Sequence, residues 1–180
     1  NTVNDGTNIG NVTERMRIQA DGDINIIGGG RILSSGGIYL GTNNNVNLLD
    51  AYEEGTWDAL LTTTGNPFNN QSAQTATYTR IGNLVTVQMQ ALTAGATSGG
   101  TGEVIVTGLP FTSTKAAFGT FNTGRIALSN TLGGSSSIPT STTYIRFLFM
   151  VSGNNANVLD ASAVNGQGTP YVSATITYQV

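Results

Sequence analysis

The chain has 180 residues, and glycine, threonine, asparagine and serine together make up 83 of them. Only 9% of the residues are charged, the net charge is −3, and there is no cysteine or histidine. These counts exclude a disulfide framework, a Cys/His zinc site, a cysteine nucleophile and a Ser-His-Asp triad. The acidic balance argues against nucleic-acid binding. No apolar run approaches the roughly 20 residues that span a bilayer, so we expect no membrane insertion.

Charge is distributed unevenly along the chain. Residues 1–58 hold eight of the ten acidic residues, whereas residues 59–180 contain only six charges in all. The apolar fraction of 38% favours a folded protein over a disordered one. The first residue is Asn1, and we expect the chain to be a piece of a longer protein. The surface of the second half should consist mainly of neutral hydrogen-bonding groups.

Residues 1–48 contain short apolar-x-apolar pieces whose starts lie seven or eight residues apart. They are Met16-Arg17-Ile18, Ile24-Asn25-Ile26, Arg31-Ile32-Leu33, Ile38-Tyr39-Leu40 and Val46-Asn47-Leu48. Each piece has too few apolar side chains to form a core alone, and such repeats become stable by stacking. We therefore expect an intertwined trimeric β-shaft, in which three copies of the chain wrap about one axis. The alternative is a flexible tether.

Residues 49–58 form a neck between the two halves. Asn45 is a candidate cap for a short helix that carries Leu48, Leu49 and Tyr52 on one face. The carboxylates of this region could bind a hard cation, but their spacing does not match an EF-hand, so we predict no metal site and no cofactor. Trp57 is expected in the core rather than as an exposed sugar-binding ring.

Residues 59–180 have the pattern of an antiparallel β-sandwich or jelly-roll-like head domain. Gly82-Asn83 has the sequence of a hairpin turn. The predicted strands are 75–81, 84–91, 103–107, 124–129, 144–151 and 171–180. Turn clusters are predicted at 94–102, 133–142, 152–157 and 165–170. Three strands alternate clearly, and the side chains expected on their buried faces are Val85, Val87, Met89, Ala91, Ile145, Phe147, Phe149, Val151, Val172, Ala174, Ile176 and Tyr178.

Several blocks of this sequence resemble the C-terminal receptor-binding domain of bacteriophage tail fibres. The first is LDAYEEGTWD at 49–58, the second is YTRIGNLVTV at 78–87, and the third is Gly108-Leu109-Pro110-Phe111. Upstream, Glu14-Arg15-Met16-Arg17-Ile18 with Asp21-Gly22 resembles a fibre-shaft repeat. The resemblance covers most of residues 14–111; residues 112–180 match only in composition and in ending on a strand.

The resemblance implies a homotrimeric fibre tip on the virion that contacts other tail proteins and binds a receptor on the host cell surface. The expected receptor is a polysaccharide or an outer-membrane component of the host. Loops held by a rigid scaffold are the expected binding sites, and their amide and hydroxyl groups suit the hydroxyls of a glycan. The candidate residues are Asn154, Asn155 and Asn157 in loop 152–157; Asn165, Gln167 and Tyr171 in loop 165–171; and Ser135, Ser136 and Ser137 in loop 133–142. The alternative is that these are ordinary turn residues.

Two other functions remain open for this sequence. One is a monomeric carbohydrate-binding module of a secreted bacterial protein, which would share the sandwich and the neutral polar surface. The other is a capsule-cleaving enzyme, which needs two neighbouring carboxylates. The head offers only Glu103 and Asp160, far apart in sequence, so we predict no enzymatic activity.

Overall fold

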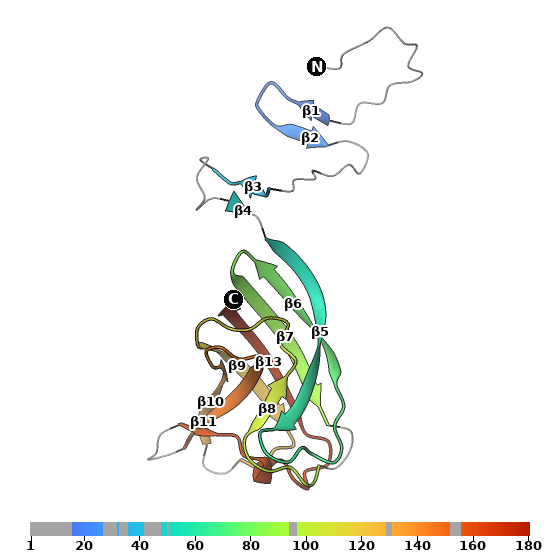
Figure 1. The fold of residues 1–180 in the computed structure, drawn as a ribbon, viewed down its shortest axis with the longest axis vertical. Coiled ribbons are helices and arrows are strands. Elements are labelled where there is room, and N and C mark those ends of the chain that lie inside the picture. The colour runs from blue at the N-terminus through green and yellow to red at the C-terminus, as the bar shows by residue number, and fades with distance from the viewer. Residues whose placement is uncertain are drawn as a thin grey trace, which may run out of the picture. The chain divides into compact units, whose positions relative to one another are not determined.

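A computed structural model describes residues 16–26, 32, 36–41, 48–49, 51–93, 97–128, 131–151 and 156–180. The chain divides into two compact units, Asn1–Ile38 and Tyr39–Val180 (Figure 1). None of the helices among these residues is long and apolar enough to cross a membrane.

The segment before the head contains short paired strands. Strands β1 (Met16–Ile18) and β2 (Ile24–Ile26) form an antiparallel hairpin, and β3 (Ile38–Tyr39) pairs with β4 (Leu48–Leu49). This confirms strands at 16–18, at 24–26 and at the start of the piece 38–40. The piece at 31–33 lies almost wholly outside the described residues. Met16, Ile18 and Ile24 are exposed within the single chain, so the trimeric shaft stays a prediction.

The predicted helix at the neck is wrong. Strand β5 (Tyr52–Thr63) already begins at Tyr52, and Leu48 and Leu49 form β4. Residues 52–58, assigned above to the neck, are the first half of a head strand. The register explains this outcome, because Tyr52 through Ala59 pair one by one with strand β6 (Gln74–Ile81) from Ile81 back to Gln74. This long ladder overrides a weak local helical pattern.

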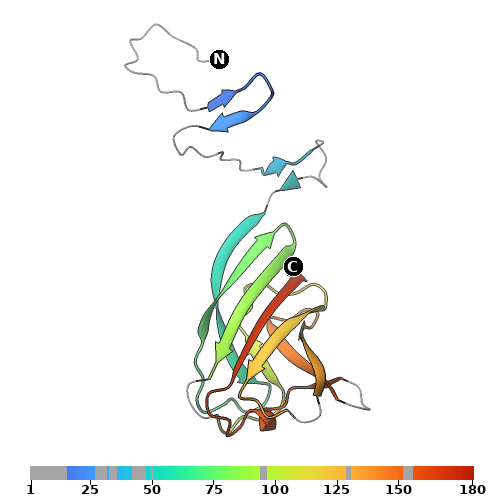
Figure 2. The same ribbon diagram turned by 180° about the vertical axis from the view of Figure 1, so that it is seen from behind.

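The head is an antiparallel sheet that closes on itself. The remaining strands are β7 (Leu84–Leu92), β8 (Val104–Thr107), β9 (Ala117–Gly124), β10 (Thr131–Ile138), β11 (Tyr144–Val151), β12 (Ala156–Val158) and β13 (Tyr171–Gln179). The order is β5-β6-β7-β13-β9-β10-β11-β8, with β8 pairing back to β5 and β12 pairing alongside β11. Figure 2 shows β13 between β7 and β9. The all-β antiparallel class is confirmed. The pairings fall into two groups, β5-β6-β7-β13-β9 and β9-β10-β11-β8-β5, which share β5 and β9 and so form a flattened closed barrel.

Two strands close the ring by pairing with different neighbours along their length. Residues 52–59 of β5 pair with β6, and residues 60–63 pair with β8. In the same way, residues 117–119 of β9 pair with β10, and residues 120–124 pair with β13. Such strands turn the corners of a flattened barrel. Closure gives every residue of β5 from 52 to 63 a strand partner, on one side for its first part and on the other for its last four residues.

The core contains the side chains that alternation predicted. All four expected inward residues of β7 and of β13 are buried, as are Ile145, Phe147 and Phe149 of β11. Trp57 is only 6% exposed, which confirms its packing in the core. The hairpin at Gly82-Asn83 is also confirmed; Gly82 has a φ of 59°, the left-handed conformation that such turns need.

The predicted strand 124–129 and the predicted loop 133–142 are both wrong. The strand is β9, which ends at Gly124, and residues 131–138 form β10. Glycines in both strands led to the wrong prediction, because glycine is typical of turns. Here these glycines allow close packing instead. A Cβ on Gly134 would lie 2.7 Å from the Phe121 ring. That ring packs against Phe147 and Phe149, with ring centroids 5.3 and 5.1 Å away.

The three head blocks that resemble tail fibres pack against one another. Phe111 of the third block lies edge-on to Tyr78 of the second, with ring centroids 5.4 Å apart, and under Arg80 at 5.0 Å. Tyr78 donates a hydrogen bond to Glu53 of the first block. The sequence blocks are therefore one structural unit at one end of the barrel, and much of their pattern is explained by packing.

Candidate functional site

An uncharged polar surface covers the outside of β7, β13 and β9. Its residues, called here the polar face, are Gln88, Gln90, Thr120, Asn122, Ser173 and Thr175. Alternation turns them outward, opposite the buried Met89 and Ala174. The register aligns them in two rows across the strands: Gln88–Thr175–Thr120 and Gln90–Ser173–Asn122. All but Ser173 are classed as exposed.

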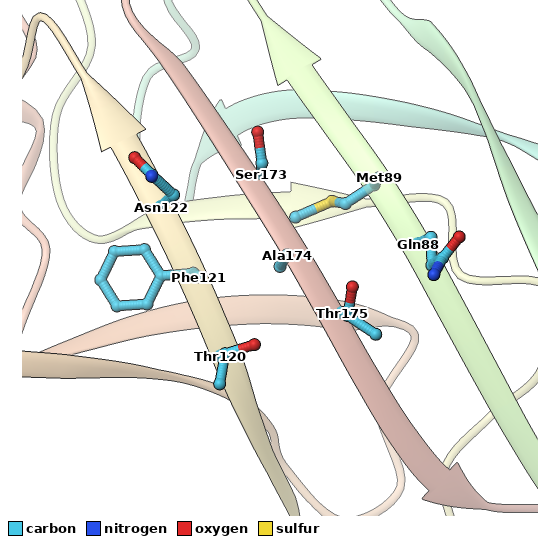
Figure 3. A pocket seen from close by; sticks show the side chains of 8 residues that line it. All are labelled: Gln88, Met89, Thr120, Phe121, Asn122, Ser173, Ala174 and Thr175. Atoms are coloured by element: carbon cyan, nitrogen blue, oxygen red, sulfur yellow. The ribbon is translucent and has the colours of Figure 1, made fainter.

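The polar face contains a shallow, open depression of about 310 Å³. Figure 3 shows the side chains that line it on three neighbouring strands. Five of the lining residues are polar and belong to the polar face. The other three, Met89, Phe121 and Ala174, lie between them on the same strands and pack toward the core. None of the eight is ionisable. The next register pair, Thr86 and Thr177, continues the hydroxyl surface with oxygens 2.8 Å apart.

Tyr171 lies at the other end of the polar face. It is the first residue of β13, on the same outward side as Ser173 and Thr175, and it pairs with Gly124 of β9. A Cβ at Gly124 would lie 2.3 Å from the Tyr171 ring, so the ring lies directly over that glycine. The sequence analysis named Tyr171 as a candidate, and the structure places it beside polar residues that the sequence analysis did not name. A partly exposed aromatic ring next to amides and hydroxyls can contact both the apolar and the polar side of a sugar.

The chemistry of the polar face is neutral hydrogen bonding. Amides and hydroxyls donate and accept without the large desolvation cost of an ionised group. Each such hydrogen bond contributes about 0.5–1.5 kcal/mol net, so one face binds weakly by itself. This arrangement suits an uncharged, hydroxyl-rich ligand.

The other predicted loop residues that the structure describes do not gather at one place. Asn165 is partly buried, and its Nδ2 donates to the carbonyl of Gly100 at 3.0 Å, which ties two loops together. Gln167 lies in the same turn, and its backbone N–H donates to the carbonyl of Val164. Asn157 is exposed on β12. Asn154 and Asn155 lie outside the described residues.

The three serines predicted in a loop are part of the barrel wall. Ser135, Ser136 and Ser137 lie in β10, and Ser136 and Ser137 are 0% and 1% exposed. The Ser136 hydroxyl donates to the carbonyl of Thr120 at 3.2 Å. Ser136 and Ser137 are therefore packing residues, and a surface ligand cannot reach them in this fold.

The structure pairs the backbones of two acidic residues that are distant in sequence. Glu103 and Asp160 face each other in an isolated antiparallel bridge. The Oδ1 of Asp160 accepts hydrogen bonds from the backbone and hydroxyl of Ser162 at 2.9 and 2.6 Å, and these hold the pKa of Asp160 below its usual value. Burial raises the pKa of Glu103, an effect that the charge of Arg146 partly offsets. Asp160 thus caps a short 3-10 helix, Ala161–Ala163.

These opposite shifts predict opposite pH effects on stability. The folded state binds the Glu103 proton more tightly than the unfolded chain, so this group lowers stability as pH rises from its ordinary pKa of 4.5 through the raised folded pKa. Glu103→Gln removes that loss. The midpoint of thermal unfolding of the variant, relative to the unmodified protein, should therefore increase as the pH rises above 4.5.

Asp160→Asn is the matched control with the reverse sign. Its folded pKa is depressed, so the carboxylate adds stability above its ordinary pKa of 3.8 and loses it on acidification. This variant should be less stable than the unmodified protein near neutrality and approach it in acid. Parallel pH profiles for Glu103→Gln and the unmodified protein would contradict the argument for Glu103.

Two carboxylates of residues 49–58 accept hydrogen bonds from tyrosines. Tyr78 donates to Glu53 and Tyr52 donates to Glu54, and these hydrogen bonds raise the pKa of both phenols. Within the described part of the chain, no group of three or more acidic side chains is arranged to hold a metal ion. Asp50 lies outside that part.

Most of the polar face cannot be identified from the pattern along a single strand. The alternation of residues 84–91 does assign Gln88 and Gln90 to an outward face, but a pattern along one strand does not identify its neighbours. Residue 173 lies beside residue 90 only because β13 inserts between β7 and β9. The usable signal was the run of outward Thr, Gln, Asn and Ser without charge.

Comparison with solved structures finds a similar fold in the Dettilon tailspike protein (gp208). The TM-score is 0.55 at 16% sequence identity, and the match covers 71% of this chain. The chain spans about a quarter of that protein, 24% of its length. No family model matches the sequence, and no curated protein matches it. The shared feature is thus the fold of one part of a tailspike.

Proposed function

We propose that this chain is a virion-attached, extracellular receptor-binding domain of a phage tail fibre or tailspike, and that it acts as a homotrimer. The observation that carries the proposal is an uncharged polar face on a barrel whose fold recurs in part of a tailspike protein. The sequence blocks at 49–58, 78–87 and 108–111 support the same assignment. Its partners would be other tail proteins and a host surface polysaccharide.

The polar face is the proposed contact for that polysaccharide. Its donors and acceptors match sugar hydroxyls, and Tyr171 offers an apolar ring at its end. A single face binds weakly, but three copies on one fibre raise the apparent affinity through effective concentration. This explains how a surface with so few charges can support adsorption.

The test combines Gln88→Ala, Asn122→Ala and Thr175→Ala in one variant. The probe is a panel of immobilised bacterial O-antigen and capsule preparations that includes at least one bound by the unmodified protein. Loss of three hydrogen bonds of about 1 kcal/mol each should weaken binding roughly 100-fold. The matched control is Thr112→Ala with Thr140→Ala and Thr143→Ala, three exposed residues away from the polar face. Equal binding by a folded triple variant would contradict the assignment of the polar face.

A monomeric carbohydrate-binding module is the second candidate. It is favoured by one observation: the inward residues of the barrel are buried within a single chain, so the head has its own complete core. The absolute mass in solution distinguishes the two. A mass near three times 18.6 kDa supports the fibre assignment, whereas the mass of one chain supports the monomeric module.

A further inference from the structure

Four large apolar side chains form an exposed row at one end of the barrel. Tyr52, Ile81, Leu84 and Phe118, called here the apolar stripe, are each 45–66% exposed. Tyr52 pairs with Ile81, and Ile81 pairs with Leu84 across the β6–β7 hairpin. Leu84 and Phe118 line one open depression of about 300 Å³ together with Lys115 and Gln179. The row therefore runs across the outside of β5, β6, β7, β13 and β9.

Exposed apolar residues gathered in one place differ from the scattered ones that any surface carries. Beyond the stripe, the outward residues of β6 at 75–79, of β7 at 86–90 and of β13 at 173–179 are threonine, glutamine and serine. The apolar stripe is thus a local departure from the neutral polar composition of the sheet. Covering it would remove the only large apolar side chains exposed on the described outer surface of these five strands.

The two ends of the apolar stripe carry opposite charges. Glu54 stands on β5 beside Tyr52, on the same outward side, and both Glu54 and Lys115 are exposed. Lys115 lies beside Phe118 at the far end. The register sets Glu54, Thr79, Thr86 and Thr177 in one row across β5, β6, β7 and β13. Three strand spacings, about 14 Å, therefore separate Glu54 from β13, and Lys115 lies beyond β13, just before the start of β9. The two charges cannot pair within one chain.

We propose that the apolar stripe is the contact between copies of this chain, with the Glu54 end of one copy meeting the Lys115 end of the next. This rests on the proposed homotrimer and specifies its head contact. A surface whose two ends are complementary forms head-to-tail contacts, and a head-to-tail contact closes into a ring when the rotation allows it. Opposite charges at the ends favour this register and disfavour meeting of like ends.

The β1–β2 hairpin before the head independently supports contact with further copies of the chain. Met16, Ile18 and Ile24 are each more than half exposed in a hairpin of two short strands. Such a hairpin is at best marginally stable alone in water. Further copies of this chain could therefore cover both exposed apolar regions, the hairpin and the apolar stripe.

The contact has a consequence for the receptor site. On the outward side of β7 and β13, the stripe row reaches the pair Leu84–Gln179 and the polar face begins at the pair Gln88–Thr175. Only one outward pair, Thr86–Thr177, lies between them. Each polar face would therefore lie beside a subunit boundary. A bound polysaccharide could then contact two copies at once.

Cross-linking of introduced thiols tests this contact, because the chain contains no cysteine. The full chain carrying both Glu54→Cys and Lys115→Cys is treated with a short flexible bismaleimide and separated on a denaturing gel. Light scattering measures the mass of the same sample before treatment. The controls are each single variant, and Glu54→Cys combined with Val158→Cys, whose second thiol lies exposed on β12 away from the stripe.

The expected result is a mass of three chains and a covalent trimer from the Glu54→Cys, Lys115→Cys variant alone. A mass of three chains without that covalent trimer overturns the stripe contact and leaves the proposed homotrimer intact. Cross-linked dimers from a single variant also overturn it, because like ends would then meet. A mass of one chain overturns both the stripe contact and the homotrimer.

Discussion

Replacing Phe147 by alanine should destabilise the head by about 3–5 kcal/mol, the usual cost of removing a buried aromatic side chain. Phe147 is 0% exposed and packs against Phe121, which lies on the strand at the other side of β10. The three rings of Phe121, Phe147 and Phe149 fill the space above Gly134 and Ser136, so no larger neighbour can move in to fill the cavity. Equilibrium unfolding in urea measures the change.

A methionine pair provides the control for this effect of burial. Met89→Ala removes a buried side chain and should cost about 2–5 kcal/mol, whereas Met150→Ala removes one that is 58% exposed and should change stability by less than about 0.5 kcal/mol. If Phe147→Ala behaved like Met150→Ala, the aromatic cluster would not form the core. The slope of the free energy of unfolding against urea concentration should stay constant, because these substitutions do not change how much surface unfolding exposes.

Replacing Gly108 by alanine should have an effect of similar size through the backbone. Gly108 has a φ of 99°, and a Cβ there would lie 2.2 Å from the carbonyl oxygen of Asp58. The positive φ costs an L-residue about 1–2 kcal/mol, and the forced displacement of β5 adds about 1–3 kcal/mol. We expect a total loss of roughly 2–5 kcal/mol in the free energy of unfolding.

Gly166 distinguishes the cost of the positive φ from the cost of the steric clash with β5. It also has a positive φ, 78°, but nothing lies within 4 Å of the Cβ that alanine would add. Gly166→Ala should therefore show only the conformational cost, about 1–2 kcal/mol. Equal losses at both positions would mean that the approach of β5 to Gly108 is not what requires glycine there.

The glycine at 108 also clarifies the tail-fibre resemblance. Gly108 passes close to Asp58 and Trp57, and Phe111 lies against Tyr78 and Arg80. These contacts account for Gly108, Phe111 and the two residues that Phe111 contacts without any ligand. In the proposed receptor-binding role, specificity is therefore expected on the outward residues, where packing leaves the choice of side chain free.

Strong local patterns in the sequence were sufficient for some elements. Alternation placed strand 144–151 and the inward faces of β7 and β13 correctly, because one face of each is buried and the other meets solvent. Absence of cysteine and histidine excluded whole classes of chemistry. Gly82-Asn83 specified its hairpin because a tight turn needs a positive φ at a residue without a side chain.

Tertiary structure alone decided the wall made by β9 and β10, the closure of the barrel and the make-up of the polar face. Gly119 lies against Ile176 and Gly134 against Phe121, so these glycines serve close packing between distant segments, although a local pattern identifies them with turns. The polar face combines residues 88, 122 and 175 because β13 enters between β7 and β9. Periodicity reports which side of a strand is buried, whereas the neighbour of a strand depends on the whole chain.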